Sequence, residues 1–115
     1  WQRYPHALAI LAAVAACLSP LSAPRTRALV LLAAALIAVS GAIGAFHAGV
    51  EYGWWEGLTT CTTSGATSLD DIMAVPLVRC DQVQWSLAGV SLAGFNAIFS
   101  LCGALAIAIF ARKAP

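Results

Sequence analysis

Three long apolar segments set the strongest limit on what this chain can fold into. They run from about residue 4 to 21, from 28 to 50 and from 86 to 111, and a helix needs roughly 20 apolar residues to cross a bilayer. Only 10% of the 115 residues are charged, whereas a soluble domain carries about 25%. The sequence therefore predicts an all-α membrane protein: a bundle of three transmembrane helices in one membrane domain, residues 1–115, with no sign of a nucleic-acid partner.

The charged residues are distributed unevenly along the chain. All five acidic residues lie between residues 51 and 81, whereas the turn 25–27 and the end 112–113 each carry two basic residues. Because Lys and Arg collect in cytoplasmic loops, both basic stretches should face the cytoplasm, and the loop 51–85 should face the opposite side. Aromatic residues agree with this orientation, since they would gather at the outer interface: Trp1, Tyr4, Tyr52, Trp54, Trp55 and Trp85.

The loop 51–85 is the main polar passage of the chain. Its first half is rich in Gly, Ser and Thr, which is typical of turns and coil. Ser68, followed three places later by Asp71, fits the capping-box pattern of a helix start. The sequence thus predicts a short amphipathic helix there, limited by Pro76 and lying on the bilayer surface.

The four cysteines fall into two pairs. Cys17 and Cys102 lie inside apolar segments, where a thiol behaves as a small buried hydrophobe. Cys61 and Cys80 lie in the loop, on the side of the membrane where disulfides persist. A bridge between them would stabilise the fold by roughly 3 kcal/mol in the chain-entropy model.

The residues alone leave two interpretations of the loop pair open. The bridge could be a structural staple, or it could be an accessible redox disulfide in a loop of small residues. Arg79 next to Cys80 favours the thiolate and makes it a better leaving group, while Asp81 on the other side opposes this effect.

Longer stretches around these cysteines resemble a known family. FHAGVEYGWWEGLTTC (46–61), PLVRCDQVQWSLAGVSLAGFN (76–96) and WQRYPH (1–6) are similar, in matching order, to segments of the DsbB family of disulfide bond formation proteins. The resemblance covers essentially the whole chain. It implies an enzyme of the bacterial inner membrane that reoxidises a DsbA-like thioredoxin-fold protein of the periplasm and passes the electrons to a quinone, either ubiquinone or menaquinone.

The resemblance also assigns roles to four residues. Cys61 and Cys80 match the catalytic loop disulfide of the family, Arg3 matches its quinone-site arginine, and His47 matches a histidine near the quinone; no metal is implied. The family has four helices and a C-x-x-C motif at the outer end of the first two. Since this chain begins at Trp1, just after the place of that motif, we expect a further helix and the motif to precede it in the full-length protein.

Purely structural roles for the polar residues in and next to the apolar segments also stay open. Arg3 could be a snorkelling arginine at a helix end, and His47 and His6 could be satisfied histidines near the interface. Glu51 and Asn96 would make interhelical hydrogen bonds or cap a helix.

Two other classes of protein are compatible with parts of the pattern. A haem-binding anchor of a respiratory complex could use His6 and His47, because antiparallel helices would bring both to one leaflet. A non-enzymatic membrane scaffold could use Cys61 and Cys80 as a staple. A thiol oxidase of the vitamin K epoxide reductase kind shares the chemistry but has different residues around its loop cysteines.

Overall fold

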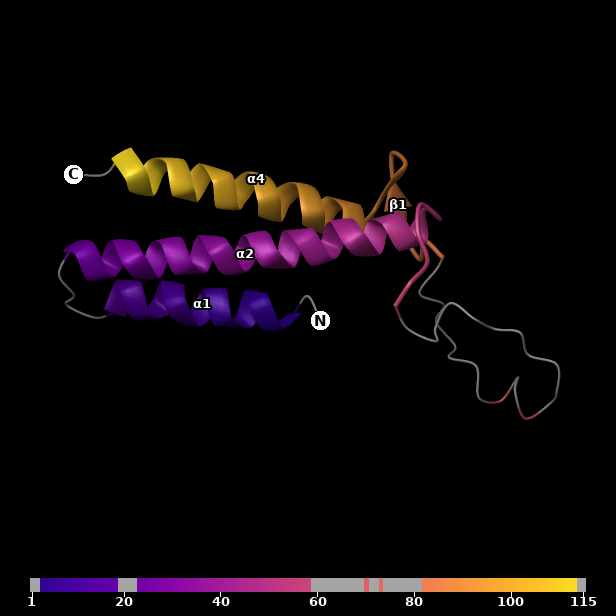
Figure 1. Ribbon diagram of the computed structural model, residues 1–115, viewed down its shortest axis with the longest axis horizontal. Helices are drawn as coiled ribbons and strands as arrows, with labels where there is room; N and C mark the ends of the chain where they lie inside the picture. The colour runs from indigo at the N-terminus through magenta and orange to yellow at the C-terminus, as the bar shows by residue number, and fades with distance from the viewer. Residues whose placement is uncertain (1–2, 19–22, 59–69, 71–72, 74–81, 114–115) are drawn as a thin grey trace.

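The computed structural model describes residues 3–18, 23–58, 70, 73 and 82–113, and it consists mainly of antiparallel helices (Figure 1). The second helix packs against both of the others, which lie on either side of it. The elements in chain order are α1 (Arg3–Leu18), α2 (Ala23–Glu51), the strands β1 (Ser86–Leu87) and β2 (Val90–Ser91), and α4 (Leu92–Lys113).

The helices agree with the three predicted spans in number and order but differ at their ends. Helix α2 begins at Ala23 rather than near residue 28, and Pro24 lies in its first turn. Proline is tolerated there, because the first backbone N–H groups of a helix have no partner within it. Helices α2 and α4 are long and apolar enough to cross a membrane, whereas α1 is a shorter apolar helix of 16 residues.

The third predicted span begins later than expected, because residues 86–91 form a β-hairpin and not helix. Ser86 pairs with Ser91 and Leu87 pairs with Val90. The two residues between the strands, Ala88 and Gly89, have φ angles of 52° and 81°, and positive φ at both central positions is what a tight hairpin turn requires. Apolar composition alone did not reveal this turn.

The interior of the bundle consists of small residues, and the large apolar side chains face outward. Buried positions are mostly alanines and serines, and Ser40 and Ser91 are fully buried. Leu11, Phe99 and Phe110 are 64%, 72% and 72% exposed. This arrangement suits a lipid environment, where small residues let helices approach closely and large apolar side chains meet the acyl chains.

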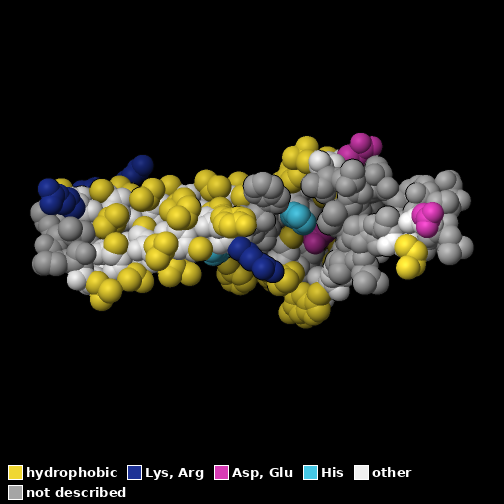
Figure 2. Space-filling view, turned by 90° about the horizontal axis from the view of Figure 1, so that it is seen from below, with side chains coloured by type: hydrophobic (Ala, Val, Ile, Leu, Met, Phe, Trp, Pro, Cys, Tyr) yellow, Lys and Arg dark blue, Asp and Glu magenta, His cyan; other side chains and the backbone are white. Residues whose placement is uncertain are grey.

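The two ends of the bundle carry opposite charge. Figure 2 shows basic side chains at one end and acidic side chains toward the other, with a further basic side chain about midway along the molecule. At the basic end, Arg27 Nη2 donates a hydrogen bond to the backbone oxygen of Arg112 at 3.4 Å, which links the start of α2 to the end of α4. This separation agrees with the charge pattern from which the orientation was predicted.

Aromatic side chains fold back over the acidic end of α2. Trp55 Nε1 donates a hydrogen bond to the backbone oxygen of Phe46 at 3.0 Å, and the two rings stack 5.8 Å apart. The hydroxyl of Tyr52 donates to Gly89 O at 2.9 Å and accepts from Ser91 N at 2.7 Å. Tyr52 thus ties the end of α2 to the hairpin that leads into α4.

Candidate functional site

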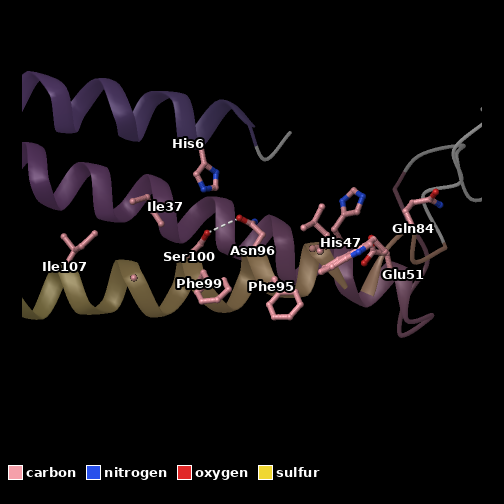
Figure 3. Close-up of a pocket in the computed structure, with 14 residues that line it drawn as sticks. His6, Ile37, His47, Glu51, Gln84, Phe95, Asn96, Phe99, Ser100 and Ile107 are labelled. Atoms are coloured by element: carbon pink, nitrogen blue, oxygen red, sulfur yellow. Dashed lines mark hydrogen bonds between the residues drawn. The ribbon is translucent and has the colours of Figure 1, made fainter. Parts of the chain in front are cut away.

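A groove of about 920 Å³ runs along α4 (Figure 3). All three helices contribute to its lining, together with residues just before β1. Its volume lies within the range of roughly 300 to 1,000 Å³ typical of small-molecule sites.

One side of the groove is aromatic. Trp85 and Phe95 lie 6.3 Å apart between ring centroids, and Phe95 stacks on Phe99 at 6.1 Å. Phe95 and Phe99 share a face of α4 because they are four residues apart. Ile37 and Leu92 also line the groove, so much of its surface is apolar.

Hydrogen-bonded polar side chains line the groove opposite these rings. His6 Nδ1 lies 2.7 Å from the hydroxyl of the fully buried Ser40. Asn96 Nδ2 donates to the backbone oxygen of Ser40 at 3.3 Å, and its Oδ1 accepts from Ser100 Oγ at 3.2 Å. The expectation that Asn96 makes an interhelical hydrogen bond is confirmed, and the cluster joins α1, α2 and α4 across the middle of the bundle (Figure 3).

The end of the groove nearest the loop carries His47 and Glu51, one helical turn apart on α2. Among the residues that the structure describes, Glu51 Oε2 is a buried side-chain oxygen that has no hydrogen-bond partner. The expectation of an interhelical bond or a cap is therefore not met by this oxygen. A buried polar atom without a partner is costly, so this position favours a ligand that can donate a hydrogen bond.

Arg3 lines a second, smaller hollow of about 370 Å³, together with His6, Ala7, Ile10 and Asn96. His6 lies opposite Ser40, and α1 runs antiparallel to α2, so Arg3 is level with a position about three residues after Ser40. At 1.5 Å of rise per residue, this position lies about 12 Å from Glu51, measured along the axis of α2 toward its N-terminus. Arg3 is the first residue of α1 and is exposed, so a snorkelling arginine at a helix end and an arginine that contacts a ligand both stay open as interpretations.

The structure does not place Arg3 and His47 in one hollow. Arg3 lines the smaller hollow and His47 the larger one, but His6 and Asn96 line both. His6 and Asn96 therefore connect Arg3 with His47, although neither of them was predicted from the sequence to have a role at the quinone site. A histidine in an apolar segment was the signal that could have drawn attention to His6.

The predicted catalytic pair, Cys61 and Cys80, lies outside the described residues, and so does the short helix expected after Ser68, apart from Asp70 and Met73. Gln84, four residues after Cys80 in the sequence, lines the groove. The loop thus rejoins the described structure at the groove.

The other two cysteines, Cys17 and Cys102, are free thiols exposed on the helices. The expectation that they are buried is wrong, because small residues occupy the helix interfaces and these thiols lie on the outward faces.

His6 and His47 both line the groove, so their placement does not decide the alternative of bis-histidine ligation of a haem. Ser40, opposite His6, and His47 are separated by about 10 Å along α2 at 1.5 Å per residue. His6 is also hydrogen-bonded to Ser40. Within the described part of the chain, no group of three or more His, Cys, Asp or Glu residues could hold a metal ion.

Comparison with protein families finds one match, to the family described as "Disulfide bond formation protein DsbB", over residues 1–110. The match extends through α1, α2, the hairpin and most of α4. Comparison with curated proteins and with solved structures gives no match.

Proposed function

This chain belongs to the DsbB family of membrane oxidoreductases that form disulfide bonds, and from that premise we propose that it reoxidises a DsbA-like thiol oxidase of the periplasm and passes the electrons to a quinone. The observation that carries the proposal is the groove. It combines an aromatic side, a polar side and the segment that follows Cys80.

The lining of the groove suits a quinone, which is a planar ring with two polar oxygens and an apolar tail. Trp85, Phe95 and Phe99 would stack against the ring or the tail. Polar groups lie on the other side, among them His6 and Asn96. Glu51 Oε2 at the outer end would accept a hydrogen bond from a hydroxyl of the reduced quinol, not from the quinone itself. A bound quinone supplies an acceptor for two electrons and two protons.

The loop cysteines would carry out the exchange with the soluble partner. A thiolate of the reduced partner attacks the Cys61–Cys80 disulfide at Cys61, so that a mixed disulfide forms and Cys80 leaves as a thiolate. The second thiol of the partner then displaces Cys61, which leaves the partner oxidised and the loop pair reduced. The C-x-x-C pair of the family would reoxidise the loop pair and deliver the electrons to the quinone.

Arg3 and His47 would act at the quinone end of this sequence. A guanidinium near a quinone oxygen stabilises the negative charge that develops on reduction, and Arg3 lines a hollow that shares His6 and Asn96 with the groove. His47, at the outer end of the groove, would contact the second polar edge of the ligand. We expect Arg3→Ala to raise the KM for quinone, and an unchanged KM would remove Arg3 from the site.

The proposal is tested by following the redox state of the loop pair in membranes. Alkylation and gel shift would show whether Cys61 and Cys80 are oxidised at rest and become reduced, or trapped as a mixed disulfide, after reduced DsbA-like protein is added. Cys61→Ser and Cys80→Ser should each abolish reoxidation of the partner.

Cys17→Ser is the matched control, since this thiol is exposed on α1 and has no role in the exchange. A loop pair that stays oxidised in the presence of reduced partner would identify a structural staple and refute the proposed function.

A further inference from the structure

His6 is an ionisable residue held well inside the bundle. Its hydrogen-bond partner Ser40 is fully buried. Ser40 lies about 16 Å along the axis of α2 from Glu51, the last residue of that helix, at 1.5 Å per residue. Ionisable side chains at such a depth are rare and mark functional paths by default. The 2.7 Å contact between His6 Nδ1 and Ser40 Oγ fixes the orientation of the imidazole, as a second hydrogen bond does for functional histidines in general.

His6 also occupies the junction between the two hollows. It lines the groove that contains His47 and Glu51, and it lines the hollow that contains Arg3. Asn96 shares this position and is held by Ser40 and Ser100. A polar head group placed between Arg3 and the groove would therefore meet the imidazole of His6.

Resting on the proposed function, we propose that His6, oriented by Ser40, donates a proton to a quinone oxygen during reduction. A dithiol becomes a disulfide and releases two electrons and two protons. The two quinone oxygens become hydroxyls by taking up two electrons and two protons, of which His6 supplies one and the dithiol the other, and the remaining proton of the dithiol passes to water. His6 then regains a proton from water at the outer end of the bundle.

The other side chains around His6 are less suited to this transfer. Arg3 remains protonated in proteins, and Asn96 and Ser100 do not exchange protons near neutral pH. His47 and Glu51 are the remaining titratable groups of the groove lining, and both lie farther out along α2. Histidine changes its protonation state near neutral pH, which suits a general acid.

The test uses the full-length protein in detergent micelles or membranes and three measurements. Quinone binding is followed by quenching of tryptophan fluorescence, with Trp85→Phe identifying the signal from the groove. Quinone reduction is measured from about pH 5 to 8. Disulfide exchange with reduced DsbA-like protein is measured by gel shift.

His6→Gln keeps a hydrogen-bonding side chain opposite Ser40 but removes the exchangeable proton. We expect a fall in kcat for quinone reduction on the order of a hundredfold and loss of its pH dependence in this range. Quinone affinity and exchange with the partner should remain within about twofold of the parent, as should all three measurements for the control Cys17→Ser. Ser40→Ala should retain a pH-dependent kcat but lower its value, because the imidazole remains but is no longer oriented.

A His6→Gln variant with parental kcat across the pH range would overturn the proposal while leaving the proposed function intact. So would a loss of rate that saturating quinone restores, since His6 would then contribute only to binding. A parent protein that exchanges with its partner but reduces no quinone would refute both proposals, and the gel-shift arm distinguishes that result from a folding failure.

Discussion

Helices α2 and α4 pack closely at Gly44, and replacing it with alanine should separate the two helices. A Cβ atom at Gly44 would lie 2.7 Å from Asn96 Nδ2, 3.1 Å from Ala93 O and 3.2 Å from Ala97 N. Two of these atoms belong to the backbone of α4 and cannot move aside alone. The methyl group must therefore push α4 outward and strain the bond between Asn96 and Ser40.

The expected cost follows from two terms. Overpacking a tight contact costs about 1–3 kcal/mol, and loss of an interhelical hydrogen bond in a membrane costs about 0.6 kcal/mol on average. Alanine regains about 1 kcal/mol of helix propensity over glycine. Gly44→Ala should thus destabilise the bundle by about 0.6–2.6 kcal/mol, measured as the free energy of unfolding in mixed micelles.

Gly103→Ala is the matched control on α4. A Cβ atom there would meet nothing within 4 Å, so only the gain in helix propensity remains, about 1 kcal/mol. The two alanine variants should differ by about 1.6–3.6 kcal/mol. Equal stabilities, within about 0.5 kcal/mol, would show that the contact at Gly44 is not close-packed in the protein and would refute this reasoning.

Three further predictions concern the hairpin and the start of α4. Ser91 is the N-cap of α4, because its Oγ accepts a hydrogen bond from Gly94 N at 3.2 Å. Ser91→Ala should therefore lower the free energy of unfolding by about 1 kcal/mol in the same assay, and an unchanged value would show that Ser91 does not cap the helix. Ala88 has a φ of 52°, which is unfavourable for a residue with a Cβ atom, so Ala88→Gly should stabilise the hairpin by up to about 1 kcal/mol; a loss of stability would contradict the turn geometry. Tyr52→Phe removes the hydroxyl that joins α2 to the hairpin and should increase hydrogen exchange at Ser91 N, whereas unchanged exchange would show that the Tyr52 hydroxyl does not hold it.

The depth of Arg3 illustrates how far the sequence could lead. The sequence indicated that Arg3 lies near the start of a helix, but not how far that helix reaches along its neighbour. In the structure His6 faces Ser40, across 34 positions of sequence, and Asn96 faces the same serine across 56 positions. Such pairings depend on the rotation and the axial shift of one helix against another. These quantities are set by side-chain packing between helices and leave no periodic signal in any one segment.

The hairpin at residues 86–91 was missed for a related reason. Ser86, Leu87 and Val90 fit an apolar helix as well as a strand, and only the positive φ angles of Ala88 and Gly89 reveal the turn. Tyr52 then holds this turn from α2. A tertiary contact therefore supports a local structure that hydropathy alone assigns to a helix.

The sequence by itself determined the apolar segments, the separation of charge between the two ends, and membership of the DsbB family, because hydropathy, charge and motif order are properties of the chain read in one dimension. Tertiary structure decided which of these residues share a site. Small residues such as Gly44 let the helices approach closely enough for Asn96 to reach Ser40, and His6 joined that cluster from α1. Burial between helices is a property of their packing, and it makes His6, rather than His47 alone, the central histidine of the groove.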